Sequence, residues 1–428
     1  MTIQEAKEFL DSYSVPYVHT DIHRMQNLMH ELGDPQKGLS FIHVAGTNGK
    51  GSACAMLASV CRKAGYRTGL FTSPHLIRFN ERIQVNGEEI SDAALAEVLT
   101  KVCEANDRLK EKVNWFEIVT AVGLVWFARC GCDMVVLEVG VGGEFDGTNV
   151  IDTPVCAVMM NLGLDHTKQL GNTLEQIART KAGIIKEGGQ VVCYRYAPEI
   201  EAVIEERCQA VGATLHKPDF NKIRPISADL DGQVFDVGDV RDIHLPLIGA
   251  HQRYNTAVVL QVVEVLRGSG FSISHEQLME GLRDVSWPVR MELVDQNPLF
   301  YVDGGHNPQC IEAALACLRS LRKESQPLVF LTGILKEKDW QTMVAMLKEE
   351  SNTFVIVEPD SSRALDRQTI ASSIQELGGD ATICSSVEEG IQKARALATH
   401  EGLVCCIGSL YLAGEVLHWF QVEKDKKQ

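Results

Sequence analysis

Residues 41–60, FIHVAGTNGKGSACAMLASV, place a glycine-rich turn between a strand-forming segment and a helical one. The strand-forming run 41–45 stops at Gly46, and a helical pattern begins at Ser52. Glycines reach backbone angles closed to other residues, so successive N–H groups of such a turn can face an anion, and the start of a helix adds partial positive charge. Lys50 supplies a full positive charge. The segment therefore predicts a phosphate-binding loop.

The match to the usual phosphate-loop pattern, G-x-x-x-x-G-K-[ST], is imperfect. The first glycine, Gly46, stands closer to the glycine that precedes the lysine than the pattern requires. In addition, Gly51 separates Lys50 from Ser52. A glycine-rich turn before a helix can also be a plain structural turn. The combination of strand, lysine, hydroxyl and helix favours the phosphate interpretation.

The chain as a whole sets further bounds. Its 428 residues are enough for two or three domains, each with its own core. The net charge of −16 argues against a general nucleic-acid surface, which needs clustered Lys and Arg, so anionic substrates require a local positive site. The N-terminus has no basic segment leading into an apolar run, and the apolar stretch 118–128 is too short to cross a bilayer. We expect a cytoplasmic protein with neither a nucleic-acid nor a membrane partner.

Candidate buried strands alternate with segments of helix length, which predicts βαβ units, a largely parallel sheet and an α/β fold. In the first part of the chain the candidates are residues 41–45, 68–72, 133–139, 155–161 and 190–194. Shorter alternating pieces between residues 218 and 247 predict a small antiparallel addition. A second α/β series comprises residues 299–303, 328–332, 353–357 and 403–407. We place the boundary at the Trp287-Pro288 linker, which gives domains 1–289 and 290–428.

Polar residues stand at the ends of three predicted strands, where α/β proteins bind ligands. Glu138 ends an apolar strand beside the phosphate loop; an acid in that place is typical of a Mg²⁺ ligand, although it can instead cap a neighbouring helix. Asp165 and His166 end a second strand, where the histidine is either a ligand or a packed, hydrogen-bonded side chain. Ser73 and His75 follow a third.

Together these segments resemble the folylpolyglutamate synthase and dihydrofolate synthase family, within the wider group of Mur-type ATP-dependent amide ligases. The motifs that carry the resemblance are HVAGTNGKGS, LFTSPHL, LEVGVGG, GLDHTKQLGNTLEQIARTKAGIIK, VDGGHNP and IGSLYL, in order from about residue 20 to residue 415. The resemblance implies an N-terminal P-loop ATPase domain with a parallel sheet and the small antiparallel addition. A C-terminal Rossmann-like glutamate-ligase domain would follow, in a protein that is commonly a monomer.

The resemblance also implies site residues. ATP would contact Gly46, Thr47, Asn48, Gly49, Lys50, Gly51, Ser52, His251, Asn255, Arg290 and Asp303. Magnesium would be held by Ser73, Glu138, His166 and Lys181, with Lys181 as a carbamate; from the sequence alone Lys181 would be a solvated helix lysine. The folate or pterin would contact Phe116, Glu117, Phe145, Asp146 and Gly147. The residues implied to act in catalysis are Lys50, Lys181 and His306, the last facing the glutamate site.

The reaction implied is ATP-dependent ligation of L-glutamate to the γ-carboxylate of a reduced folate through an acyl phosphate. Lys50 and Mg²⁺ would stabilise the transferring phosphoryl group, and no protein nucleophile is needed. Dihydropteroate is a further candidate acceptor. A ligase for another carboxylate and amino acid is a second interpretation. A P-loop ATPase or regulatory nucleotide-binding module without ligase activity is a third, from a different class.

Four departures from the family pattern bear on these alternatives. Glu144 replaces the usual arginine after the metal glutamate, which supports a changed carboxylate substrate. Val289 stands where glycine is usual, next to Arg290. The start of NWFE, residues 114–117, is altered, and residues 12–24 have no convincing counterpart of the pterin-contact segment of dihydropteroate-using members. The last two differences favour folylpolyglutamate synthase over dihydrofolate synthase.

Overall fold

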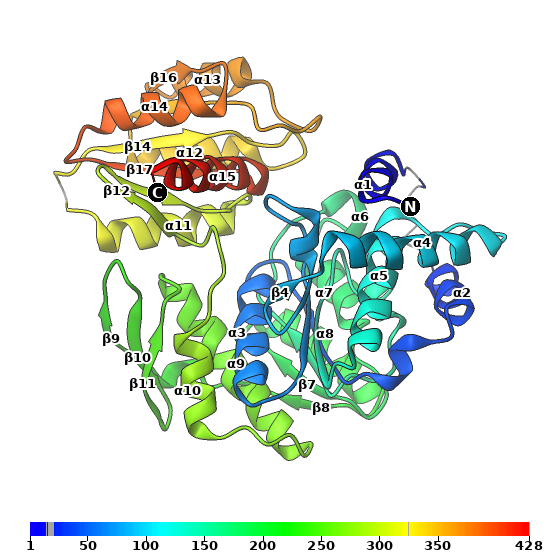
Figure 1. The fold of residues 1–428 in the computed structure, drawn as a ribbon. Helices are drawn as coiled ribbons and strands as arrows, with labels where there is room; N and C mark the ends of the chain where they lie inside the picture. The colour runs from blue at the N-terminus through cyan, green and yellow to red at the C-terminus, as the bar shows by residue number, and fades with distance from the viewer. Residues whose placement is uncertain (14, 16–20, 324, 428) are drawn as a thin grey trace. The chain divides into compact units, whose positions relative to one another are not determined.

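The computed structural model describes residues 1–13, 15, 21–323 and 325–427. The chain divides into two compact units, each treated by itself below (Figure 1). The first comprises Met1–Arg224, Asp236–Ile243 and Tyr254–Val285, and the second comprises Pro225–Phe235, His244–Arg253 and Ser286–Gln428. Each unit has a mostly parallel sheet accompanied by helices, which confirms the predicted α/β class.

An eight-stranded sheet forms the centre of the first unit, in the order β4-β3-β2-β5-β1-β6-β7-β8. Neighbouring strands are parallel except in the pairs β2–β3 and β3–β4. The strands are β1 (Phe41–Ala45), β2 (Thr68–Phe71), β3 (Ile83–Val85), β4 (Glu88–Glu89), β5 (Met134–Glu138), β6 (Cys156–Met159), β7 (Gln190–Cys193) and β8 (Thr214–His216). Because β1 lies between β5 and β6, the carboxyl ends of these three strands meet at one edge of the sheet.

The helices that accompany this sheet are α1 (Ile3–Ser12), α2 (His23–Glu31), α3 (Lys50–Lys63), α4 (Asp92–Arg108), α5 (Trp115–Cys130), α6 (Thr167–Leu170), α7 (Leu174–Ala182), α8 (Pro198–Ala210), α9 (Ala250–Gly268) and α10 (His275–Arg283). Some contact its strands, and others pack on a neighbouring helix, as α1 does on α4 and α10 does on α3. The first residues of α9, up to Arg253, belong to the second unit. Side chains alternate along a strand, so Phe41, His43 and Ala45 of β1 share a face. Phe41 packs in a core with α4 and α5, and Ala45 packs in a core with α7 and α8. Helix α3 contacts β1, β2 and β5.

A small separate sheet corresponds to the predicted addition. It consists of β9 (Ile223–Ala228), β10 (Gln233–Val237) and β11 (Val240–Leu245), in the order β11-β10-β9. Neighbours in this sheet are also neighbours along the chain.

The second unit contains a six-stranded sheet in the order β12-β13-β17-β14-β15-β16. Only the pair β12–β13 is antiparallel. The strands are β12 (Glu292–Gln296), β13 (Leu299–Val302), β14 (Leu328–Thr332), β15 (Thr353–Ile356), β16 (Asp380–Ile383) and β17 (Leu403–Ile407). The helices are α11 (Pro308–Leu321), α12 (Trp340–Glu350), α13 (Arg367–Glu376), α14 (Val387–Ala398) and α15 (Leu410–Lys427).

One element boundary differs from the prediction in a way that matters for the site. Helix α3 begins at Lys50, two residues before the predicted start at Ser52, because Gly49 takes a left-handed φ of 82° and caps the helix at once. The division of function between residues 1–289 and 290–428 stays a prediction. Part of the stretch 12–24, namely residues 14 and 16–20, lies outside the described residues.

In the described part of the chain, no helix has the length and apolar character that crossing a bilayer requires.

Candidate active site

The glycine-rich loop, residues 46–52, turns from β1 into α3. The backbone N–H groups of Thr47 and Asn48 donate to the carbonyl oxygen of Asn161 at 2.8 and 3.1 Å, so these two groups tie the loop to the chain after β6. At Gly49 a Cβ atom would lie 2.7 Å from Oδ1 of Asn255, which leaves no room for a side chain. An α-helix leaves its first N–H groups without intrahelical partners, so the start of α3 is the part of the loop that can receive a phosphate.

Lys50 and Glu138 stand next to each other at the ends of neighbouring elements. Val44 of β1 pairs with Glu138 of β5, and the Lys50 ammonium lies 4.0 Å from Oε1 of Glu138. The backbone N–H of Ser73 donates to Oε2 of Glu138 at 2.9 Å. Glu138 is 3% exposed, so the structure holds a buried carboxylate beside a lysine at the mouth of the loop.

Lys181 on α7 is buried, contrary to the expectation from sequence alone of a solvated helix lysine. Its Nζ atom donates to the carbonyl oxygen of Gly46 at 2.8 Å, which places the amine under the loop. Burial and the nearby charge of Lys50 lower the pKa of Lys181 to about 7. The helix therefore presents an amine with a large neutral fraction at neutral pH.

His166 lies at the N-terminal end of α6, with a left-handed φ of 50°, and its backbone N–H donates to Oδ1 of Asp165 at 2.8 Å. Across the residues that the structure describes, no three His, Cys, Asp or Glu side chains gather as a metal site. The predicted magnesium set contains two side chains of those types, Glu138 and His166, and depends for the rest on Ser73 and Lys181. That assignment stays a prediction.

The loop from β2 is organised by two consecutive residues that the sequence argument missed. The Glu81 carboxylate accepts the backbone N–H groups of Leu76, Ile77 and Arg78 at 2.6 to 2.9 Å. Nε of Arg82 donates to Nδ1 of His75 at 2.8 Å, and the guanidinium of Arg82 lies over the Trp115 ring at 5.0 Å. The charged pair in ERI marks these residues in the sequence, although only the fold reveals their partners.

The predicted folate residues come together where residues 140–149 pass the start of α5. A Cβ atom at Gly140 would lie 2.5 Å from the Phe116 ring, and one at Gly147 would lie 3.2 Å from Cγ of Glu117. Burial raises the pKa of Glu117, whose carboxylate lies 3.9 Å from the Arg24 guanidinium. Phe145 is half-buried in the same loop. The glycines thus allow this loop to lie against α5.

Asp146 is 1% exposed and organises the 140–149 loop from within. Its Oδ1 accepts the N–H of Thr148 at 3.0 Å and the hydroxyl of Thr148 at 2.5 Å, and its Oδ2 accepts the N–H of Val141 at 2.9 Å. Nε2 of His43 lies 2.9 Å from the same hydroxyl oxygen. Sequence reasoning missed His43; its signal was a single polar side chain within the apolar strand FIHVA.

In the second unit, Arg290 lies close enough to affect both His251 and Asp303. Burial, with Arg290 as a second cause, lowers the pKa of His251 to about 4, while burial raises the pKa of Asp303 against the effect of Arg290. Asp303 accepts the N–H groups of Met291 and Gly305 at 2.9 and 2.7 Å.

The two remaining sequence predictions in this unit concern Val289 and His306. Val289 has a left-handed φ of 51°, which explains why glycine is expected there. Nδ1 of His306 donates to the carbonyl oxygen of Gly304 at 2.9 Å, which fixes the ring beside the turn that follows β13.

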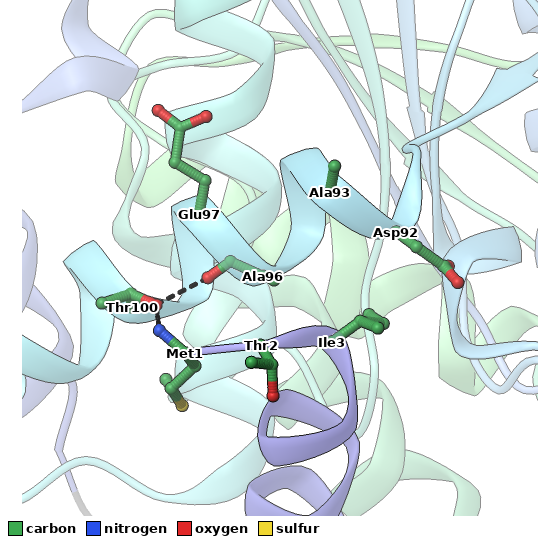
Figure 2. Close-up of a pocket in the computed structure, with 8 residues that line it drawn as sticks. All are labelled: Met1, Thr2, Ile3, Asp92, Ala93, Ala96, Glu97 and Thr100. Carbon is green, nitrogen blue, oxygen red and sulfur yellow. Dashed lines mark hydrogen bonds between the residues drawn. The ribbon is translucent and has the colours of Figure 1, made fainter.

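A surface groove between α1 and α4 contains none of the predicted site residues (Figure 2). Its lining includes Met1, Thr2, Ile3, Asp92, Ala96 and Thr100. The terminal amine of Met1 donates to Oγ1 of Thr100 at 2.9 Å, and that hydroxyl donates to the carbonyl oxygen of Ala96 at 2.7 Å.

Comparison with known proteins identifies two family domains. Residues 44–263 match the Mur ligase middle domain, and residues 289–410 match the glutamate ligase domain of Mur ligases. The folylpolyglutamate synthase of Lacticaseibacillus casei is 36% identical over 427 residues, covering 94% of this chain and 97% of that protein. The dihydrofolate synthase/folylpolyglutamate synthase of Bacillus subtilis is 36% identical over 377 residues, covering 84% of this chain and 86% of that protein.

Solved structures agree with the sequence matches. The Mycobacterium tuberculosis folylpolyglutamate synthase complexed with ADP and AMPPCP has a TM-score of 0.90 at 28% identity, over 98% of both chains. E. coli FolC in complex with DHPP and ADP has a TM-score of 0.88 at 27% identity, over 99% of both chains.

Proposed function

This chain belongs to the folylpolyglutamate synthase and dihydrofolate synthase group of the Mur ligase family, and we propose that it joins L-glutamate to the γ-carboxylate of a reduced folate at the expense of ATP. The observation that carries the proposal is the arrangement of Lys50, Glu138 and Lys181 around the glycine-rich loop. This arrangement brings together the start of a helix, an ammonium group and a buried carboxylate. Such a set suits a nucleoside triphosphate and the cation that accompanies it. ATP is therefore the proposed nucleotide.

In the proposed reaction, an oxygen of the folate γ-carboxylate attacks the γ-phosphorus of ATP, and ADP leaves. The neutral amine of glutamate then attacks the acyl carbon, an amide bond forms, and inorganic phosphate leaves with its electron pair and takes up the proton that the amine loses. Lys50 and the start of α3 stabilise the negative charge that spreads over the transferred phosphoryl group. The reaction needs no nucleophile from the protein.

The residues present fit magnesium, with one condition. Glu138 offers a buried carboxylate at the loop, whereas Lys181 in its protonated, ammonium form would repel a cation. Attack of the neutral Lys181 amine on CO₂ forms an N–C bond, releases one proton and leaves an anionic carbamate, and a pKa of about 7 favours that step. Ser73, Glu138, His166 and the carbamate would then hold the ion. Bound there, Mg²⁺ would neutralise phosphate charge during the transfer.

The 140–149 loop and the start of α5 form the proposed folate subsite. Phe116 offers an aromatic face, and Gly147 brings the backbone close to Glu117. In the second unit, His251, Arg290 and Asp303 are the proposed contacts of the rest of the nucleotide, and His306 is proposed to face glutamate. The monomeric state and the cytoplasmic location expected from the sequence stay predictions.

Dihydropteroate is the second candidate acceptor, because the Bacillus subtilis relative carries both activities in its name. The test is glutamate-dependent phosphate release from Mg-ATP, with tetrahydrofolate, 5,10-methylenetetrahydrofolate and dihydropteroate compared and each product weighed by mass spectrometry. Release and a glutamylated product with the folates support the proposal, and a product with dihydropteroate as well makes the enzyme bifunctional. Absence of product with all three acceptors would overturn it in favour of another carboxylate, and phosphate release without any acceptor would favour a nucleotidase module.

A further inference from the structure

His43 is a fully buried histidine in the middle of the strand that leads into the glycine-rich loop. Its neighbours Ile42 and Val44 are apolar and equally buried. The imidazole points to the 140–149 loop, where Nε2 lies 2.9 Å from Oγ1 of Thr148. The reaction proposed above makes no use of this side chain.

The hydrogen bonds around Thr148 fix the state of the imidazole. Both oxygens of Asp146 accept backbone N–H groups, as an ionised carboxylate does, so the Thr148 hydroxyl donates its proton to Oδ1 of Asp146 at 2.5 Å. The hydroxyl oxygen must then accept from His43. Nε2 of His43 therefore carries the hydrogen, and Nδ1 carries the lone pair.

The other ring nitrogen shows that this arrangement has a cost. Nδ1 of His43 is buried without any hydrogen-bond partner. An unsatisfied buried acceptor destabilises a folded protein, and an apolar side chain in the same strand would avoid that loss. What the histidine adds, and an apolar side chain would not, is the hydrogen bond from Nε2–H to Thr148.

The Nε2–H donor of His43 stabilises the 140–149 loop. By holding the Thr148 hydroxyl, His43 aims it at Asp146, and Asp146 in turn holds the N–H groups of Val141 and Thr148. Gly147, inside the same short turn, is the residue that approaches Glu117. We propose that His43 is a positioning residue: through Thr148 and Asp146 it sets the loop that receives the folate. The inference rests on the proposed function for its ligand, but not for its geometry.

This assignment changes the role expected for Asp146. A carboxylate that is 1% exposed and accepts three donors within its own loop acts by shaping that loop. Contacts from this segment to a ligand then come from its backbone and from neighbouring side chains such as Phe145.

The test compares His43→Leu with His43→Gln. A glutamine amide can place an N–H donor near the position of Nε2, whereas leucine cannot. We expect His43→Leu to raise KM for tetrahydrofolate roughly tenfold while KM for ATP stays within about twofold, and His43→Gln to recover most of the loss. An unchanged folate KM in His43→Leu, or equal loss in both variants, would overturn the proposal.

A second measurement works without the proposed activity. Hydrogen exchange in the ligand-free protein should speed up at the amides of Val141 and Thr148 in His43→Leu, and return towards native rates in His43→Gln. Thr148→Val should match His43→Leu, and Thr148→Ser should match the native chain; these variants serve if the leucine protein does not fold. Native exchange rates in both His43→Leu and Thr148→Val would overturn the positioning role. Failure of the native protein to bind tetrahydrofolate would instead overturn the proposed substrate, with the exchange result still standing.

Discussion

The amine of Lys181 donates a hydrogen bond to the carbonyl oxygen of Gly46, across 135 residues of sequence, at 2.8 Å. This bond joins α7 to the first residue of the glycine-rich loop. Because the amine is buried and near Lys50, its pKa falls from the ordinary 10.5 to about 7. The loop geometry and the chemistry of Lys181 are therefore linked.

The first prediction is a pH dependence of stability that comes from Lys181. Below pH 7 the folded and unfolded chains both hold the proton, and folding carries the full cost of the buried charge. Between pH 7 and 10.5 only the unfolded chain holds it, so the free energy of unfolding rises with pH by about 1.4 kcal/mol per pH unit from this group. In CO₂-free buffer, we expect the native stability minus that of Lys181→Met to increase by roughly 2–3 kcal/mol from pH 7 to pH 9.

Urea unfolding of both proteins at pH 7, 8 and 9 measures this difference. Lys168→Met, which changes an exposed lysine on α6, is the matched control and should follow the native pH dependence. Parallel curves for the native protein and Lys181→Met would contradict a depressed pKa.

The second prediction is that the same amine takes up CO₂. Incubation with ¹³C-labelled bicarbonate should give a carbamate carbon signal in the native protein that is missing from Lys181→Ala and kept in Lys168→Ala. Lys181→Ala should lose ligase activity and regain part of it with added short carboxylates, which can enter the space left by the side chain. An active native sample that shows no carbamate signal would count against this chemistry.

The third prediction concerns Gly49. Gly49 and Gly65 have nearly the same left-handed φ, 82° and 89°, but a Cβ at Gly49 would lie 2.7 Å from Asn255, while one at Gly65 would meet nothing within 4 Å. Alanine at either position should cost about 1–2 kcal/mol of stability from backbone strain. Only Gly49→Ala should also displace Asn255 and weaken ATP binding.

Chemical unfolding and calorimetric ATP titration separate the two effects. Gly65→Ala supplies the strain without the contact, so it should bind ATP as the native protein does. Equal ATP affinity in Gly49→Ala and Gly65→Ala would mean that the contact with Asn255 has no role in holding the nucleotide.

The elements that could be predicted from the sequence are those whose pattern lies within a few consecutive residues. The segments 41–45, 328–332 and 403–407 are short and largely apolar, and each forms a strand with those bounds. The predicted phosphate loop joins β1 to a helix for the same reason: strand, glycines, lysine and helix follow one another directly. Glu138 could be placed at a strand end from its own neighbours.

What escaped prediction depends on contacts between distant segments. Lys181 belongs to an ordinary amphipathic helix, and its burial follows from how α7 lies under the loop. The role of His43 needs a partner, Thr148, that is 105 residues away. Helix α3 starts early because of the backbone angle at Gly49, which the hydrophobic pattern does not report.

The last prediction concerns Glu144, the residue that departs most from the expected pattern. Its side chain is exposed, while its backbone is fixed on both sides: its N–H donates to the carbonyl oxygen of Thr180 at 2.9 Å, and its carbonyl oxygen accepts from Asn149 at 3.0 Å. Glu144→Arg should therefore leave the fold and the affinity for ATP unchanged. Because the change reverses a charge on the 140–149 loop, it should raise the affinity for more anionic, longer polyglutamates relative to the monoglutamate, by several-fold at low salt and less at high salt.

Steady-state kinetics with folates bearing one, two and three glutamates, at low and high salt, tests this expectation. Glu144→Gln removes the charge without reversing it and should give an intermediate preference. Identical selectivity in all three proteins would show that residue 144 faces away from the path of the substrate, and the departure at this position would then have no bearing on the choice of carboxylate.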